Sequence, residues 1–206
     1  MSGENGFAER RVELRGGSEV LIRAITPHDK RALRDGFERL SPSSRYRRFL
    51  TPMARLTDRQ LAYLTELDHR DHEALVAELR PGGEGLGVAR FVRDAEDPGV
   101  AEAAVAIVDE WQGNGLGTAL LQALAGRARE LGIERFRCLV FTDNGEMIEL
   151  LRQLGPLSES ERGGGAVELE VELPLAAEGA GHELLAVLRS AAVEALELLR
   201  APIGRG

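Results

Sequence analysis

The stretch between Ala101 and Gly132 constrains the fold more than any other part of the chain. It begins with Ala101–Val108, an apolar run of small and β-branched residues that contains a single acid. Gln112–Gly117 follows, with three glycines in five positions. Thr118–Leu131 then has apolar residues at helical spacing, and Gly132 is the kind of residue that ends a helix. The apolar stripe comprises Leu120, Leu121, Leu124, Ala128 and Leu131. The pattern predicts a strand, a tight loop and a helix in succession.

A glycine loop between a strand and a helix start is suited to binding an anion. Glycines leave the backbone N–H groups accessible, and the helix start adds unsatisfied donors and a partial positive charge. The loop lacks the Lys-Ser/Thr pair of a P-loop, and its G-x-G-x-G spacing differs from the dinucleotide fingerprint G-x-G-x-x-G. We therefore expect a phosphate group of another kind of ligand; the alternative is a glycine-rich connection without a ligand.

Composition excludes several classes of protein. With 206 residues, 43% apolar and 29% charged, the chain is long enough for one domain with its own core. A net charge of −8 argues against nucleic acid as a partner. We find no signal peptide and no apolar run of membrane-spanning length, so we expect a cytoplasmic protein that does not bind membranes. One cysteine and four histidines without ligand spacing predict no metal site.

The remaining sequence predicts a mixed α/β domain, which we place at residues 9–176 after a frayed start at 1–8. The expected strands are Arg11–Leu14, Val20–Ile25, Glu73–Leu79, Leu86–Val92, Phe136–Phe141, a strand from Leu157 and Ala166–Leu173. The expected helices are one opened by Thr26-Pro27, one capped by Ser41 or Ser43, Asp58–Leu67 and Glu146–Leu154.

Residues 177–206 read as a linker and a C-terminal amphipathic helix. Gly181–Arg200 carries a stripe of leucines and alanines with glutamates opposite. This helix docks either on its own domain or on a second copy of the chain, so a homodimer is one possible assembly.

The glycine loop matches the motif Gln-x-x-Gly-x-Gly at Gln112, Gly115 and Gly117. The chain thereby resembles the GNAT acetyltransferases, and the order of elements from Val12 to about Leu175 is similar to theirs. Within that family it looks like the Pat-type protein lysine acetyltransferases. The similar stretches are Ile22–Asp29, Leu40–Phe49, Ala74–Ala77 and Ala101–Glu102. The resemblance implies a GNAT fold, with a mostly antiparallel central sheet flanked by helices, here with an extra C-terminal helix.

The resemblance also implies acetyl-CoA as cosubstrate and assigns roles to individual residues. The residues implied to bind the cofactor are Val105, Ile107, Gln112, Gly113, Asn114, Gly115, Leu116, Gly117, Thr118 and Asn144. An acid at the position of Glu102 is the general base in the Pat-type subgroup. The acceptor is then an amine, most simply a protein lysine side chain, for example of an acyl-CoA synthetase.

The chemistry of the reaction agrees with an acid at Glu102. A lysine ammonium must lose a proton before it attacks a thioester, and a nearby carboxylate can accept that proton directly or through water. Glu102 is the one acid within the apolar central strand. The alternative is that its side chain points outward into solvent. Asp109 and Glu110 would repel a pyrophosphate, so we expect both to point outward.

Several features leave alternatives open. The helix after Asn144 has no Tyr to protonate a leaving thiolate, and it closes on Gly155-Pro156. The arginines of Arg45–Arg48 either bind anions or form salt bridges. Cys138 either carries an acyl group or, as its apolar neighbours favour, packs in the core. Many Pat-type relatives carry a regulatory domain, for which we expect no room here. Acetylation of a small amine and a non-catalytic acyl-CoA-binding module remain as other functions.

Overall fold

The computed structural model describes residues 6–161 and 165–174. The chain divides into two compact units, 1–174 and 175–206. The predicted C-terminal helix lies outside the described residues, and so does most of the predicted frayed start. Of residues 6–8, Phe7 departs from the prediction of fraying, because its side chain is only 8% exposed and belongs to the main core cluster.

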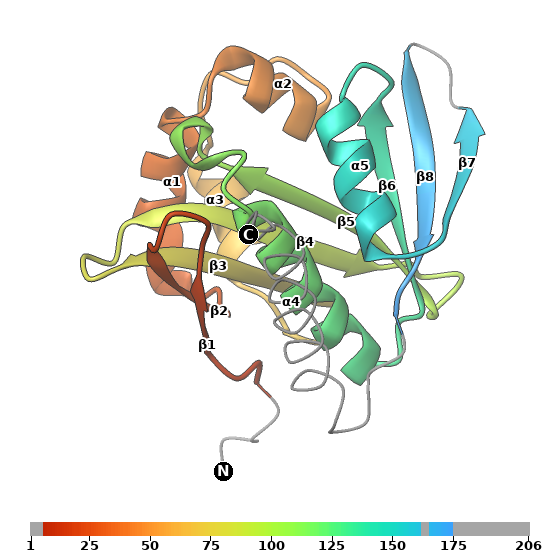
Figure 1. The fold of residues 1–206 in the computed structure, drawn as a ribbon, viewed down its shortest axis with the longest axis horizontal. Coiled ribbons are helices and arrows are strands. Elements are labelled where there is room, and N and C mark those ends of the chain that lie inside the picture. Colours follow the sequence, from red (N-terminus) through yellow and green to blue (C-terminus); the bar gives the residue numbers. More distant parts are fainter. Residues whose placement is uncertain (1–5, 162–164, 175–206) are drawn as a thin grey trace, which may run out of the picture. The chain divides into compact units, whose positions relative to one another are not determined.

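The described unit is built on one eight-stranded sheet with the order β1-β2-β3-β4-β5-β6-β8-β7 (Figure 1). All neighbouring strands are antiparallel except β5 and β6, which run parallel. The strands are β1 Arg10–Glu13, β2 Glu19–Ala24, β3 His72–Arg80, β4 Gly85–Arg93, β5 Val100–Ile107, β6 Arg135–Phe141, β7 Leu157–Glu161 and β8 Ala166–Glu172. This confirms the predicted mixed α/β class with a mostly antiparallel sheet.

Helices cover both faces of the sheet (Figure 1). Helices α4 and α5 lie on one face, and α1 and α3 lie on the other, while α2 lies beside the end of β5. The helices are α1 Lys30–Glu38, α2 Pro42–Phe49, α3 Asp58–Thr65, α4 Leu116–Glu130 and α5 Gly145–Leu154, with short 3-10 turns at Pro27–Asp29 and Asp109–Trp111.

The helix starts follow from capping residues. Ser41 begins α2, because its hydroxyl oxygen accepts a hydrogen bond from Ser44 N at 3.1 Å. This settles the predicted choice between Ser41 and Ser43. Thr57 begins α3 in the same way, and Gln60 reciprocates by accepting a bond from Thr57 N at 2.9 Å.

Helix α4 begins at Leu116, two residues earlier than the prediction, with Gly115 as its N-cap. It ends at Glu130, so the predicted stripe residue Leu131 lies just beyond the helix and is only half-buried. The other four predicted stripe residues are at most 1% exposed. Leu116 adds a further buried position, because the helix start turns its side chain into the core.

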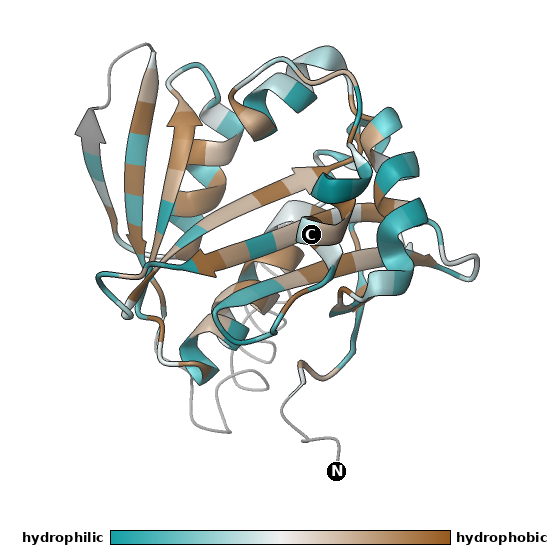
Figure 2. Cartoon of the chain, turned by 180° about the vertical axis from the view of Figure 1, so that it is seen from behind, coloured by the Kyte–Doolittle hydropathy of each residue, from teal (hydrophilic) through white to brown (hydrophobic). Residues whose placement is uncertain are grey.

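Strand β5 separates the two faces of the core. Ala101 and Ala103 belong to the main cluster under α4, whereas Ala106 packs against the cluster formed by α1 and α3. Because side chains alternate along a strand, Glu102 and Ala104 share the face of Ala106. Figure 2 shows apolar residues concentrated along the central strands and alternating with polar ones along β8, as the alternation of valine or leucine with glutamate predicts.

Candidate functional site

The two parallel strands at the centre of the sheet diverge after three residue pairs. Val100–Glu102 of β5 pair with Arg135–Arg137 of β6. Beyond these residues the two strands no longer pair with each other (Figure 1). The divergence opens a cleft of about 420 Å³, which is lined by β5, the glycine loop, β6, α5 and α2. The sequence did not indicate this opening, because nothing in either strand marks where the pairing ends.

The edge of β5 that faces the cleft carries unpaired backbone groups. Val108 N donates to Leu86 O of β4, so alternate residues of β5 turn their polar groups toward β4. The residues in between therefore turn theirs to the other side. The backbone of Ala103 hydrogen-bonds Cys138 of β6, whereas Val105 and Ile107, beyond the paired segment, face the cleft. Ile107 O confirms this direction, because it accepts a hydrogen bond from Gln112 Nε2 at 2.9 Å across the end of the strand. The predicted residues Val105 and Ile107 both line the cleft.

The glycine loop leaves its backbone accessible at the end of the cleft. Gly113 and Gly115 have φ angles of 76° and 86°, which disfavour any side chain at either position. No side chain caps α4, and its first turn contains no acid, so its first N–H groups are not satisfied by a side chain. Gly117 allows close packing of α5, because a Cβ there would lie 3.3 Å from Leu150 Cδ2. This loop is therefore suited to bind an anion, as the sequence predicts.

Not every predicted loop residue lines the cleft. Gln112, Gly113, Gly115, Gly117 and Thr118 line it. Asn114 and Leu116 do not, and the Leu116 side chain is buried in the core, so only its backbone can serve a ligand.

Gln112 and Asp109 hold the loop in place. The Gln112 amide donates to Asp109 Oδ1 at 3.2 Å as well as to the end of β5. Asp109 Oδ2 in turn accepts from Ser41 N, at 3.2 Å, at the start of α2. Asp109 does not line the cleft, as expected, but its carboxylate is half-buried and joins the loop to α2 rather than extending into solvent. Glu110 is exposed and faces Arg39 at 3.6 Å, as expected of an outward acid.

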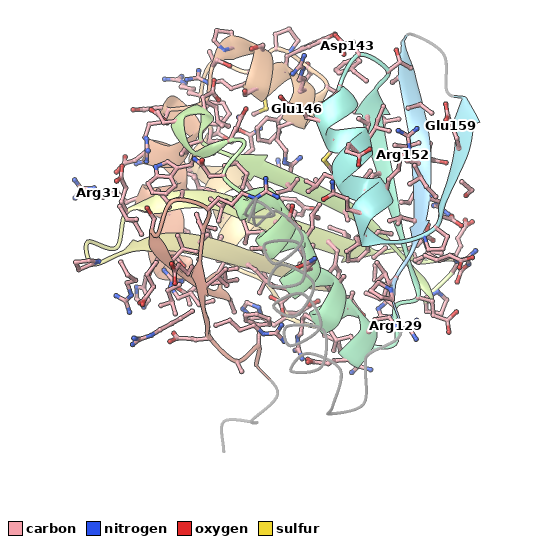
Figure 3. All side chains as sticks on the ribbon, in the orientation of Figure 1. Arg31, Arg129, Asp143, Glu146, Arg152 and Glu159 are labelled. Carbon is pink, nitrogen blue, oxygen red and sulfur yellow. The ribbon has the colours of Figure 1, made fainter. Side chains whose placement is uncertain are left out.

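The opposite wall of the cleft comes from β6 and α5. Asn144 caps α5 by accepting from Met147 N at 3.4 Å and lines the cleft, where the sequence places it. Tyr46 of α2 stacks on Phe141 at the end of β6, with ring centroids 5.0 Å apart. In Figure 3, Asp143 and Glu146 are labelled where β6 turns into α5. Of these two acids, Glu146 lines the cleft.

Glu102 sits at the last residue pair before the strands diverge, opposite Arg137. Its side chain is exposed on the α1–α3 face of the sheet and does not line the cleft. The exposed side chain agrees with the alternative that the sequence left open, that Glu102 points outward into solvent, because the alternation along β5 turns it away from the core under α4. An amine approaching from that face would nevertheless meet this carboxylate beside the cleft.

Cys138 lies in the cleft wall but stays a thiol. Its side chain is 2% exposed, and burial raises its pKa to about 12. The thiol is therefore protonated at neutral pH and is a poor nucleophile. This supports the packing interpretation over an acyl-carrier role.

A second cavity of about 80 Å³ lies on the α1–α3 face of the sheet. Its lining is mainly apolar and includes Phe37, Leu56 and Leu64 of that cluster. The charged residues that line it are three arginines and two acids: Arg23, Arg48, Arg90, Asp29 and Glu78. Leu40, Arg48 and Ala106 line both this cavity and the cleft, so the two spaces share a wall. The sequence analysis missed Arg90, whose place in an alternating strand resembles that of an ordinary exposed residue.

The arginines of α2 do not act alike. Arg45 donates to three backbone carbonyls, of Glu38, Leu40 and Ala54, and so fixes the loops around α2. Arg47 and Arg48 line the cleft instead. Within the described part of the chain no carboxylate lies within ion-pair distance of any of the three. The expectation of salt bridges is therefore wrong for this helix.

Among the residues that the structure describes, no cluster of three or more potential metal ligands occurs. None of their helices is long and apolar enough to cross a membrane.

Comparisons with known proteins agree with this geometry. The model of the acetyltransferase (GNAT) family matches residues 34–155. The chain is 34% identical over 163 residues to acetyltransferase Pat of Mycolicibacterium smegmatis, a match that covers 79% of this chain and 48% of that protein. The chain thus spans about half the length of this curated relative.

Solved structures of acetyltransferases also share this fold. The GNAT domain of Pat from S. lividans superposes with a TM-score of 0.74 at 34% identity, covering 80% of this chain and 97% of that domain. The yncA protein of Salmonella typhimurium, solved with its cofactor acetyl-CoA, shares the fold at a TM-score of 0.61 and 21% identity, covering 78% and 96% of the two chains.

Proposed function

Because this chain belongs to the GNAT family of acetyltransferases, we propose that it moves the acetyl group of acetyl-CoA to a primary amine. The observation that carries the proposal is the cleft between β5 and β6, with the accessible backbone of the glycine loop at its end. The acetyl-CoA seen in the yncA structure supports the choice of cosubstrate.

The cosubstrate would be held mainly by backbone groups. The N–H groups of the glycine loop and of the first turn of α4 suit the pyrophosphate, because they combine free donors with the positive end of a helix. The pantetheine arm suits the unpaired edge of β5, where the N–H groups of Val105 and Ile107 face the cleft. Asn144 lines the opposite wall. Arg15 and Arg47 also line the cleft and add positive charge for the phosphates.

The proposed reaction is a direct transfer. The carboxylate of Glu102 accepts a proton from the ammonium group, and the free amine attacks the thioester carbonyl. The resulting oxyanion accepts a hydrogen bond from the N–H of Val105. When the intermediate collapses, the C–S bond breaks, the amide forms and coenzyme A leaves as a thiolate, which takes its proton from solvent. No Tyr occurs in α5 to supply it, and the protonated thiol of Cys138 argues against an acyl-enzyme step.

The acceptor we favour is a lysine side chain of another protein, for example an acyl-CoA synthetase. The similarity to Pat supports this choice. A small amine is the second candidate, and the apolar cavity beside the cleft favours it, because that cavity is too small for a folded partner. The cytoplasm as the site of action and a homodimer through residues 177–206 stay predictions of the sequence.

The test is calorimetric titration with acetyl-CoA, followed by thiol release on addition of acceptors. Micromolar binding, with release only when an acyl-CoA synthetase is added, is the result expected for a protein lysine acetyltransferase. Release with free amines would select the second candidate. Binding of acetyl-CoA without transfer to any amine would indicate a non-catalytic acyl-CoA-binding module. Absence of binding would refute the cleft as the acetyl-CoA site.

A further inference from the structure

Arg90 is a buried cation whose charge has no anionic partner. Its side chain points from β4 into the cavity on the α1–α3 face and is only 6% exposed. Its Nη2 atom has no hydrogen-bond partner among the described residues. The guanidinium lies over the ring of Tyr63, 5.2 Å from the centroid, and makes a side-chain hydrogen bond with Tyr63, but no carboxylate of the described chain is within ion-pair distance of it.

Arg48 brings a second cation to the same cavity. It reaches there from α2 and lies over the ring of Phe49, 4.9 Å from the centroid. Burial and then the charge of Arg90 lower the pKa of Arg48 to about 10, so Arg48 remains cationic at neutral pH. Two arginines outside any ion pair with the described residues thus line one small cavity, which the paired group of Arg23, Asp29 and Glu78 also lines.

This arrangement is unusual within the molecule. Arg23 lines the same cavity but is paired with Asp29, at 2.7 Å, and with Glu78. A buried unpaired charge costs several kcal/mol in general, and this chain has a surplus of carboxylates with its net charge of −8. Arg90 is buried and Arg48 is half-buried, and neither has a carboxylate partner among the described residues, which leaves both without a counter-ion from the chain.

Arg48 and Arg90 lie close to the residues that we propose for the reaction. Arg90 pairs with Ala104 in the ladder between β4 and β5, and its neighbour Val92 pairs with Glu102. Arg90 and Glu102 are thus diagonal neighbours on one face of the sheet, within reach of one long side chain. Arg48 lines both the cavity and the cleft. An anion at this pair would lie beside both the base and the position proposed for the thioester.

We propose that Arg48 and Arg90 form a carboxylate-binding subsite, so that the acceptor is an amine that carries a carboxylate near the reacting nitrogen. The apolar lining has room for about five water-sized groups, which suits a short aliphatic part of the same molecule. The carboxylate comes either from a free amino acid or from an acidic side chain next to a target lysine. This inference rests on the proposed acetyl transfer.

The test compares acceptors that differ only in this charge. In the first arm, leucine is compared with leucinamide. In the second, a lysine peptide with Glu beside the lysine is compared with the same peptide carrying Gln. We expect kcat/KM to be at least about tenfold higher for the carboxylate member of one pair, as the loss of a charge-assisted contact predicts. The arm that shows the difference identifies the source, and equal values in both arms would overturn the proposal.

The variant Arg90→Met should abolish that preference while leaving the KM for acetyl-CoA unchanged. Arg90→Lys should restore part of it, because lysine keeps the charge but not the forked geometry. Arg31→Met is the matched control, since Arg31 is exposed on α1 and projects away from the sheet (Figure 3). An equal loss with both members of a pair would indicate a structural role for Arg90 and contradict the subsite.

A binding experiment separates this proposal from the proposed function. Titration with 4-methylpentanoate, which has the carboxylate and no amine, is expected to show saturable binding that Arg90→Met removes and Arg31→Met keeps. Such binding without acetyl transfer to any amine would support the subsite and refute the enzymatic proposal. Acetyl transfer with neither carboxylate binding nor carboxylate preference would refute the subsite alone.

Discussion

Glu102 lies at the last residue pair before β5 and β6 separate, with its side chain exposed on the α1–α3 face of the sheet. Replacing Glu102 by Gln keeps the size and removes the proton acceptor. We expect kcat for thiol release to fall by about 10²–10⁴-fold, the usual contribution of a general base. The affinity for acetyl-CoA in calorimetry should not change, because Glu102 does not line the cleft.

The matched control for this variant is Glu159→Gln. Glu159 is an exposed acid on β7, at the far side of the sheet (Figure 3). Its replacement changes the net charge by the same amount and should leave both kcat and cofactor affinity as they are. Full activity of Glu102→Gln would remove Glu102 from the mechanism.

Gly115 offers a second test at the residue scale, with a control on the same helix. Gly115 and Gly132 flank α4, with φ angles of 86° and 81°, and a Cβ at either would meet nothing within 4 Å. Glu at either position should lower the free energy of unfolding by about 1–2 kcal/mol through backbone strain. Only Gly115→Glu should abolish binding of acetyl-CoA in calorimetry, because it places bulk and negative charge at the loop. Equal affinities in the two variants would refute the loop as the pyrophosphate site.

At the scale of elements, α2 depends on its first residue. It has no fully buried residue, so the cap provided by Ser41 is a large part of what fixes its start. We expect Ser41→Ala to lower the free energy of unfolding by about 1 kcal/mol in a urea titration. Ser43→Ala is the control, because its hydroxyl contacts only Ser41 Oγ, at 2.9 Å, and should change stability much less. A similar loss of free energy of unfolding in both variants would show that the Ser41 cap does not stabilise α2.

Local patterns predicted these elements well, for reasons visible in particular residues. Capping side chains such as Thr57 and helix-ending glycines such as Gly132 act within a few residues, so their effect can be read from the sequence. The start of α4 was placed two residues too late because the glycines of the loop obscure its first turn. The exposure of Glu102 and the burial of Arg90 depend on which helices cover each face of the sheet. This packing joins distant parts of the chain, so no local sequence pattern shows it.

The sequence predicted the part of the site that consists of backbone groups. It predicted less of the part that depends on side chains from different elements. The motif at Gln112, Gly115 and Gly117 fixed the loop, and the cleft-lining residues of β5 followed from the resemblance. The divergence of β5 and β6 after Glu102 depends on what packs between the strands, so no local signal marks it. The cavity that joins Arg48 to Arg90 unites α2 and β4, which are far apart in sequence.

The stability of the whole molecule should depend on pH in two separate ranges. Burial, followed by the charge of Arg90, lowers the pKa of His72 to about 4, against about 6.5 when unfolded. The unfolded chain therefore binds the extra proton first, and stability present above pH 6.5 is lost as the pH falls toward 4. The pKa of Asp29 is held below its usual value by hydrogen bonds from Arg23 and Thr26, so its contribution is lost only at still lower pH.

Thermal unfolding between pH 8 and pH 4 checks this expectation. The melting temperature should fall between pH 6.5 and pH 4, and His72→Asn should flatten that part of the curve. His28→Asn is the control, because His28 is exposed and its replacement leaves the half-buried imidazole of His72 in place. A curve that His72→Asn does not alter would show that His72 is not the group responsible.

The divergence of β5 and β6 also leaves strand edges with which other molecules could pair. Unpaired strand edges usually invite strands of other molecules and so promote aggregation. Here the two open edges face each other across a narrow space, and α2 and α5 contribute residues to its walls. The stacking of Tyr46 on Phe141 holds α2 against the end of β6. A foreign strand would therefore have to pass these helices before it could pair with either edge, whereas a thin, flexible ligand arm would not.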